Sequence, residues 1–227
     1  NVWSIIVALT KFNYNSFDLT TAASKGLAFN SSANGFETSS ATSMILIKTL
    51  TASSSATLSF VDGSSSVVLD NTYPVYMFKL INIHIASDTQ KLQFNFSTDS
   101  GSNYNVAKTT TMFNAAHAED DSFASLAYDD GDDLAQGTGF QSISGTGLGS
   151  GNDESLSAEM FLFNPSSTTF VKHYILRSVQ NSAINYAYDS YSAGYGNTTS
   201  AIDAIQFKAG SGNIDSGTIK LYGIKDS

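Results

Sequence analysis

The chain has 227 residues and a net charge of −9, and it contains 15 Phe, 11 Tyr and 17 Gly but only 2 Pro. It has no Cys, which excludes disulfides, thiolate metal sites and cysteine nucleophiles. The acidic balance disfavours nucleic acid as a direct ligand, and no apolar run is long enough to predict membrane insertion.

Residues 1–43 scatter aromatic and aliphatic side chains among Asn, Ser and Thr without a sustained period. This pattern fits either an extended N-terminal arm that attaches to a partner or an ordinary N-terminal sheet layer. The chain does not begin with Met, and residues 1–7 lack the basic start and the cleavage site of a signal peptide. We therefore expect either a processed product or an unusual translation start.

From residue 44 onward, short apolar runs alternate with polar turns rich in Ser, Gly, Asn and Asp. This alternation predicts strands at residues 44–50, 57–60, 67–69, 75–85, 91–97, 104–113, 157–163, 170–177, 185–191, 201–208 and 218–224. Strands at this spacing predict an all-β fold, a β-sandwich or jelly roll, with residues 44–227 as one domain.

Two of these segments carry further information. In residues 75–85 the large apolar side chains share one face up to Leu80 and the other face from Ile81 onward. That change of face indicates either a β-bulge or a central strand covered on both sides. In residues 218–224, Ile219 and Leu221 alternate with more polar neighbours, which predicts a half-buried strand.

The strand pattern breaks down between residues 114 and 155. Residues 115–120 predict a short helix with Asn114 as its N-cap, and the glycines that follow predict a long acidic Gly-rich loop. Long loops are usually functional or disordered, so this one is a candidate contact surface. Its carboxylates either gather around Ca²⁺, which binds oxygen ligands, or form a solvated acidic loop. The candidate metal ligands are Asp129, Asp130, Asp132 and Asp133.

A second candidate surface consists of four tyrosines: Tyr186, Tyr188, Tyr191 and Tyr195. Exposed tyrosines suit contacts with a protein or carbohydrate partner, because the ring supplies apolar area and the hydroxyl supplies a hydrogen bond. The alternative is a cross-strand aromatic ladder within the sheet.

Catalytic motifs are weak in this sequence. The three histidines, His84, His117 and His173, fall in separate segments, and no Gly-x-Ser-x-Gly elbow frames a nucleophile. Glycoside cleavage by paired carboxylates depends on their separation in space, which the sequence does not give. We expect no enzymatic activity.

Five segments carry recognisable motifs: YPVYMFKLINI at residues 73–83, DSGSNY at 99–104, LFNPSSTT at 162–169, TSAIDAIQF at 199–207 and SGNIDSGTIKLYG at 211–223. In order and spacing they resemble a domain that recurs in structural genes of tailed bacteriophages, notably marine and cyanobacterial ones. The resemblance covers residues 50–224. Residues 8–11, ALTK, also look like the opening of many phage fibre genes.

This resemblance implies a structural protein of the virion, assembled in the host cytoplasm, with no catalytic residues to transfer. We expect a tail fibre or receptor-binding module. The alternatives are a capsid decoration (cement) protein and, outside the particle, a secreted carbohydrate-binding or carbohydrate-degrading protein. The expected partners are other virion proteins through residues 1–43, further copies of the chain in a homo-oligomer, and a host-surface glycan or protein. Analogy with fibres implies a trimer.

Overall fold

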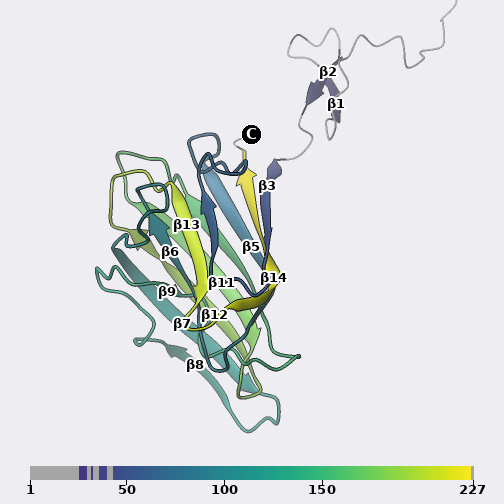
Figure 1. Cartoon of the computed structure of the whole chain (residues 1–227), viewed down its shortest axis with the longest axis vertical. Coiled ribbons are helices and arrows are strands. Elements are labelled where there is room, and N and C mark those ends of the chain that lie inside the picture. Colours follow the sequence, from purple (N-terminus) through teal and green to yellow (C-terminus); the bar gives the residue numbers. More distant parts are fainter. Residues whose placement is uncertain (1–25, 30–31, 33–35, 40–42, 226–227) are drawn as a thin grey trace, which may run out of the picture. The chain divides into compact units, whose positions relative to one another are not determined.

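The computed structural model describes residues 26–29, 32, 36–39 and 43–225, and the chain divides into two compact units, residues 1–43 and 44–227 (Figure 1). In the first unit, β1 (Gly26–Phe29) and β2 (Phe36–Ser39) form an antiparallel pair, and the rings of Phe29 and Phe36 stack with centroids 4.9 Å apart. The expectation of an attachment arm concerns mainly residues 1–25, which lie outside the described residues.

The second unit is an antiparallel sandwich of two unequal sheets, which confirms the expected all-β sandwich. The larger sheet has the strand order β3-β14-β5-β10-β11-β12-β7-β8, and the smaller has the order β4-β13-β6-β9. The strands are β3 (Met44–Thr51), β4 (Leu58–Val61), β5 (Val75–Ile85), β6 (Leu92–Ser97), β7 (Lys108–Ala118), β8 (Ala124–Tyr128), β9 (Gln141–Ser142), β10 (Leu156–Phe163), β11 (Lys172–Asn181), β12 (Tyr186–Gly196), β13 (Ala204–Ala209) and β14 (Ile214–Ile224). No helix in the described residues is long and apolar enough to cross a membrane.

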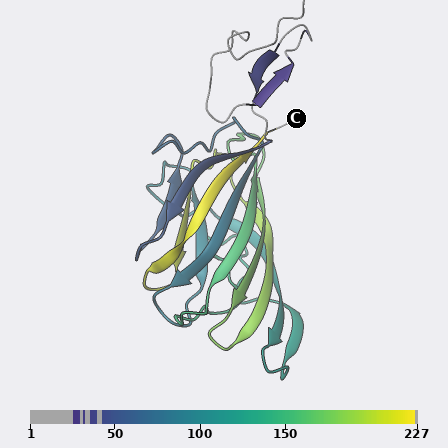
Figure 2. The same cartoon turned by 90° about the vertical axis from the view of Figure 1, so that its right-hand side faces the viewer.

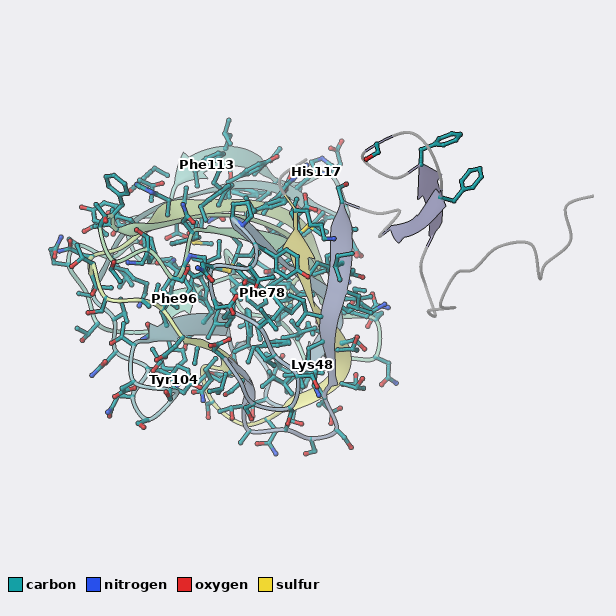
Figure 3. All side chains as sticks on the ribbon, turned by 90° about the horizontal axis from the view of Figure 1, so that it is seen from above. Lys48, Phe78, Phe96, Tyr104, Phe113 and His117 are labelled. Carbon is teal, nitrogen blue, oxygen red and sulfur yellow. The ribbon has the colours of Figure 1, made fainter. Side chains whose placement is uncertain are left out.

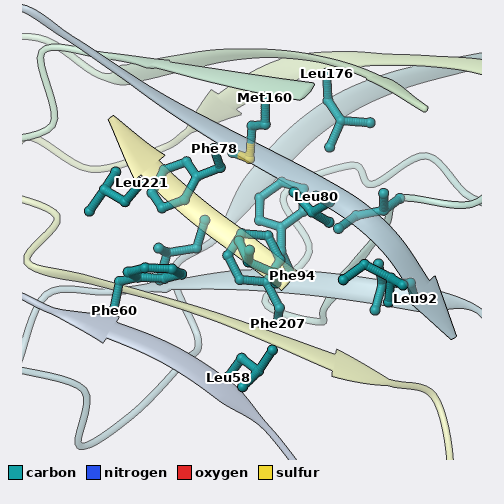
Figure 4. Packing of buried hydrophobic residues seen from close by; sticks show 14 of the residues in the cluster. Leu58, Phe60, Phe78, Leu80, Leu92, Phe94, Met160, Leu176, Phe207 and Leu221 are labelled. Carbon is teal, nitrogen blue, oxygen red and sulfur yellow. The ribbon is translucent and has the colours of Figure 1, made fainter. Parts of the chain in front are cut away.

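An aromatic cluster fills the space between the two sheets. The ring centroid of Phe207 on β13 lies 5.7 Å from that of Phe78 and 6.3 Å from that of Phe60. Phe94 on β6 meets Tyr174 on β11 edge to face, with centroids 5.1 Å apart, in an arrangement that aromatic quadrupoles favour. All five side chains are at most 1% exposed, and Figure 4 shows Phe94 and Phe207 together within this cluster.

A β-bulge in β5 accounts for the change of face in its sequence. The register with β10 and with β14 shifts beside Ile81 and Asn82, and Asn82 has a φ of 49°. The extra residue returns Ile83 and Ile85 to the inner side with 0% exposure, whereas Ile81 is 39% exposed. Gly217 lies opposite with a φ of 110°, where a Cβ would come within 2.5 Å of the Asn82 carbonyl oxygen, so the bulge requires glycine there.

The predicted helix at residues 115–120 is wrong, because β7 runs through that segment to Ala118. Buried and exposed residues alternate along β7, and Asn114 is only 8% exposed. The strand pairs with β12 on one side and with β8 on the other. Hydrogen bonds to these two strands satisfy the backbone N–H and C=O groups that would otherwise pair within a helix. Pairing between strands therefore outweighs the preference of Asn114 for a helix N-cap.

The Gly-rich segment after β8 is buried in part, which corrects the expectation of a contact surface along its whole length. Residues 141–145 are buried and lie against the inner side of β7, β11 and β12. Ser178 Oγ donates a hydrogen bond of 2.6 Å to the Ile143 carbonyl. A Cβ at Gly145 would lie 2.3 Å from Asn114 Oδ1, so a larger residue would displace that buried amide. These residues serve as a structural cover.

The second unit has two distinct ends. Its first and last strands begin and finish side by side, because Met44 of β3 pairs with Ile224 of β14. The opposite end carries the turn at residues 119–123 between β7 and β8 and the turn at residues 182–185 between β11 and β12. We call this opposite end the distal end; it is at the bottom of Figure 1.

The core predicts a strong effect of Phe207→Ala on stability. The substitution removes a ring that contacts three others and leaves a cavity, so the free energy of unfolding should fall by about 3–5 kcal/mol. Phe170→Ala is the control, because that ring is 70% exposed and its loss should cost less than about 0.5 kcal/mol. Urea unfolding measures both values, and similar losses for the two variants would contradict this packing.

Lys108 is a buried cation without a carboxylate partner in the described structure. Its side chain is 0% exposed, and its ammonium donates to Asn95 Oδ1 and, at 2.9 Å, to the Val106 carbonyl. The Asn95 amide in turn donates to the carbonyls of Tyr104 at 2.7 Å and Thr138 at 2.9 Å, which ties two connecting segments to β6. Burial lowers the pKa of Lys108 to about 7.

This buried lysine predicts that stability rises with pH. Between about pH 7 and about pH 10 the unfolded chain holds a proton that the native Lys108 has lost, so the free energy of unfolding should increase by roughly 1 kcal/mol per pH unit. Thermal or urea unfolding across this range should show the rise in wild type and in Lys48→Met, a control at a half-buried lysine that hydrogen-bonds the Ser65 carbonyl. In Lys108→Met the rise should be absent. An unchanged pH dependence in that variant would refute the assignment.

Candidate binding surfaces

The four candidate tyrosines of β12 do not form one surface. Successive residues of a strand point to opposite faces, and Ser190 is buried on the inner face, the side toward the smaller sheet. Tyr186 and Tyr188 therefore lie on the inner side, close to the distal end. Tyr191 and Tyr195 lie on the outer face, which is the side of the eight-stranded sheet turned away from the smaller sheet.

At the distal end, Tyr186 is the centre of a stack of three aromatic rings. Its centroid lies 5.4 Å from that of Phe123 and 6.3 Å from that of Tyr188, with interplanar angles of 27° and 17°. Phe123 is 43% exposed and Ile184 beside them is 55% exposed. Burial raises the pKa of Tyr188, so its hydroxyl stays protonated at neutral pH. We call these four residues the distal cluster.

A cavity of about 260 Å³ opens beside the distal cluster, and Glu119, Asp120, Ser122, Ile184, Asn185 and Tyr186 line it. Tight turns shape its walls: Asp121 and Asn185 have φ values of 61° and 59°, a conformation that Asp and Asn tolerate. The amide of Ser122 donates to Asp120 Oδ1 at 3.0 Å, and hydrogen bonds of this turn lower the pKa of Asp120. The cavity thus combines aromatic area with ionised acceptors.

Tyr191 belongs to an aromatic and ionic row on the outer face. Its ring stacks on that of Phe113 with centroids 4.9 Å apart and planes at 4°, so the cross-strand ladder considered for the tyrosines is present here. The Arg177 guanidinium lies 5.1 Å from the Tyr191 centroid. It also donates to both carboxylate oxygens of Asp189, at 2.9 and 2.7 Å, and this carboxylate raises the pKa of Arg177. Tyr195 lies farther along, 6.2 Å from His173 between centroids.

Further apolar side chains are exposed on the outer face, and Figure 2 shows the strands of this sheet side by side. Figure 3 shows Phe113 on the side of the sheet away from Phe78 and Phe96 in the interior. The most exposed large side chains here are Met44, Leu46, Ile81, Phe113, Leu126, Tyr128, Ile175 and Val179, at 39% to 74%. A groove of about 430 Å³ crosses the face beside the β5 bulge, between Ile81, Glu159 and Arg177.

Three of the four candidate metal ligands, Asp129, Asp132 and Asp133, each have a different non-carboxylate partner, and Asp129 and Asp132 also lie close enough to affect each other. Asp129 accepts from the Asn114 amide at 2.8 Å, Asp132 forms an ion pair with Lys91, and Asp133 accepts from the Tyr128 hydroxyl. Burial raises the pKa of Asp132, Asp129 adds to this rise, and Lys91 opposes it. Within the described residues no group of three or more His, Cys, Asp or Glu is placed to hold a metal ion. Calcium binding stays a prediction that rests on composition.

The three histidines lie apart, on β5, β7 and β11. His84 Nδ1 is 3.4 Å from Asp215, and its Nε2 is 3.0 Å from the Gly151 carbonyl oxygen. His117 Nε2 is 3.1 Å from the exposed Asp121. These pairs join the ends of strands and turns.

Sequence reasoning missed Phe113, Phe123, Ile175 and Arg177 as surface residues. Alternation along β11 and β12 gives two equally regular faces, and nothing within either strand tells which one is buried. One signal was available: residues 172–181 place Ser178 and Gln180 in one register and Ile175 and Val179 in the other. Each register mixes polar and apolar residues, because Leu176 shares that of Ser178 and Arg177 shares that of Ile175, which indicates that neither face is an ordinary core.

Comparison of the chain with protein-family models, with curated proteins and with solved structures found no match.

Proposed function

We propose that this chain is a non-enzymatic structural protein of a tailed-bacteriophage particle, of the tail-fibre or receptor-binding type. The support from the sequence is the set of motifs between residues 50 and 224 that resembles phage structural domains. The support from the structure is an all-β unit with large exposed aromatic surfaces and two distinct ends. In this role the chain would reside in the virion and contact other virion proteins through residues 1–43.

The observation that carries the proposal is that the two ends of the second unit differ. The chain enters at Met44 and leaves at Ile224, side by side at one end of the sheet. The distal cluster and its cavity lie at the other end, on the turns of two hairpins. A unit held to a particle at its chain ends would point this cluster outward, and binding residues are often found on such turns.

The chemistry of the distal cluster favours a neutral glycan or a basic protein segment on the host surface. Stacked rings offer flat apolar area, and the carboxylates of Glu119 and Asp120 accept hydrogen bonds from hydroxyl or ammonium groups. The same carboxylates repel phosphate, which disfavours phosphorylated glycans.

A capsid decoration protein is the second candidate function. It is favoured by the division of the chain at residue 43, since a separate first unit suits attachment to a capsid. Decoration requires a copy number that matches capsid symmetry, and removal of residues 1–43 should then abolish attachment to heads. A secreted carbohydrate-active protein would instead turn over a polysaccharide, with activity lost when Asp129, Asp130, Asp132 and Asp133 are changed to Asn.

Host-cell binding by the purified full chain tests the receptor-binding role. Phe123→Ala combined with Tyr186→Ala should weaken binding to host cells or to envelope glycans by roughly tenfold or more, because aromatic anchors carry much of the binding energy. Phe170→Ala is the control: its ring is exposed and lies in the connection from β10 to β11, away from the distal turns. Flow cytometry with labelled protein gives the affinities.

Two results would contradict the proposal. Failure of the wild-type chain to bind host cells and their envelope glycans would remove the receptor-binding role. Equal binding by the double variant and by Phe170→Ala would show that the distal cluster is not the contact.

A further inference from the structure

The outer face of the eight-stranded sheet carries straight rows of side chains across several strands. One row follows the strand registers through Leu46, Tyr222, Met77, Phe161 and Ile175 and continues to Ala193. Leu46 and Ile175 are 50% and 53% exposed, and only Met77, in the middle, is buried by its neighbours. An apolar row of this length at the surface is unusual for a monomer and marks an interaction site.

The next row is charged, with two lysines followed by a glutamate and an arginine. From β14 to β12 it contains Lys220, Lys79, Glu159 and Arg177, followed by Tyr191, with Asp189 one pair farther along β12. These three bases and two acids together carry a net charge of +1, whereas the whole chain carries −9. Two acidic chains would therefore repel each other least when they approach through this face.

The centre of the strand order lies between β10 and β11, with four strands on each side. A two-fold axis that runs parallel to the strands at this point would place a second copy against the outer face. Each row would then face the same row of the second copy, with the strand order reversed. Glu159 of one copy would then face Arg177 of the other, and Lys79 would face the ring of Tyr191. Such pairs are opposite charges and a cation over an aromatic ring.

About the same axis, the apolar row of one copy would also fit against the apolar row of the other. Phe161 would face Ile175, and Met77 would face the small Ala193. Within this row, large side chains on β5 and β10 of one copy thus meet smaller ones on β12 and β11 of the other, which lets the two sheets interdigitate.

The size of the face also fits a second copy. Eight strands at a spacing of about 4.8 Å span roughly 34 Å, and seven residues along a strand span roughly 23 Å. The resulting footprint of about 800 Å² per partner is that of a standard stable interface.

We propose that the outer face is the interface between two copies of this chain, packed face to face about a two-fold axis that runs between β10 and β11. The dimer buries the rows from Leu46 to Ala193 and from Lys220 to Tyr191, and it leaves the distal cluster accessible. This pairing does not depend on the phage role, so it stands or fails separately from host-cell binding.

Sedimentation velocity of the full chain tests the dimer. Wild type should sediment with twice the chain mass of 24.1 kDa at micromolar concentration. Ile175→Glu should weaken the dimer by roughly 100-fold, because it buries an unpaired charge in the interface. Ile184→Glu is the matched control, since it makes the same change at a residue that is 55% exposed in the distal turn, and it should remain dimeric. Circular dichroism checks that both variants are folded, and Leu46→Glu on β3 provides a second disrupting variant.

The absence of native cysteines allows the axis itself to be tested. Ile175→Cys should give covalent dimers with a short bis-maleimide, because the two thiols lie near the axis, whereas Ile184→Cys should give none. A monomeric wild type, a trimer, or a dimer unaffected by both Ile175→Glu and Leu46→Glu would overturn the proposal.

Discussion

The structure depends on one mismatch: an eight-stranded sheet is covered by a partner sheet of only four strands. The aromatic cluster around Phe207 fills the space where the two sheets overlap. Beyond that overlap, residues 141–145 cover β11, β12 and β7, and the inner side chains there are small and polar, such as Ser178 and Ser190. A backbone segment packed on a sheet needs polar partners for its own carbonyls, and Ser178 donates to that of Ile143, which explains serine rather than leucine at this position. At Ser190 the close approach of Gly145 leaves room only for a small side chain.

This mismatch also determines which surfaces remain for partners. Where residues 141–145 cover β11 and β12, the inner side chains are polar, and Ile175 and Tyr191 of these strands lie on the outer face. The outer face exposes apolar rows, and the charges of its central row nearly balance, which suits the proposed interface between copies. The cavity beside the distal cluster is small and lined by carboxylates, which suits a ligand. The two surfaces are formed by different strand ends and faces, so the proposed pairing of copies and the proposed ligand binding would not compete.

Much of the fold could be predicted from the sequence, because local alternation is strong wherever one face is an ordinary core. Ile219 and Leu221 were expected to be buried and are 0% exposed, and the bulge near Ile81 was one of two expected alternatives. Prediction failed where long-range pairing decides the outcome. Asn114 looks like a helix cap, but pairing with β12 and β8 makes its segment a strand. The site was found only in part, since the four tyrosines of β12 are divided between two faces that the sequence alone cannot distinguish.

The central claim is that the outer face is a contact surface rather than a solvated one. Hydroxyl-radical footprinting of the full chain at low and at high protein concentration tests it most directly, by following the oxidation of individual side chains. Phe161, Ile175 and Tyr222 should become protected at high concentration, whereas Phe123 of the distal cluster should react equally at both. Equal reactivity of the outer-face residues at the two concentrations, or protection confined to Phe123, would contradict the account.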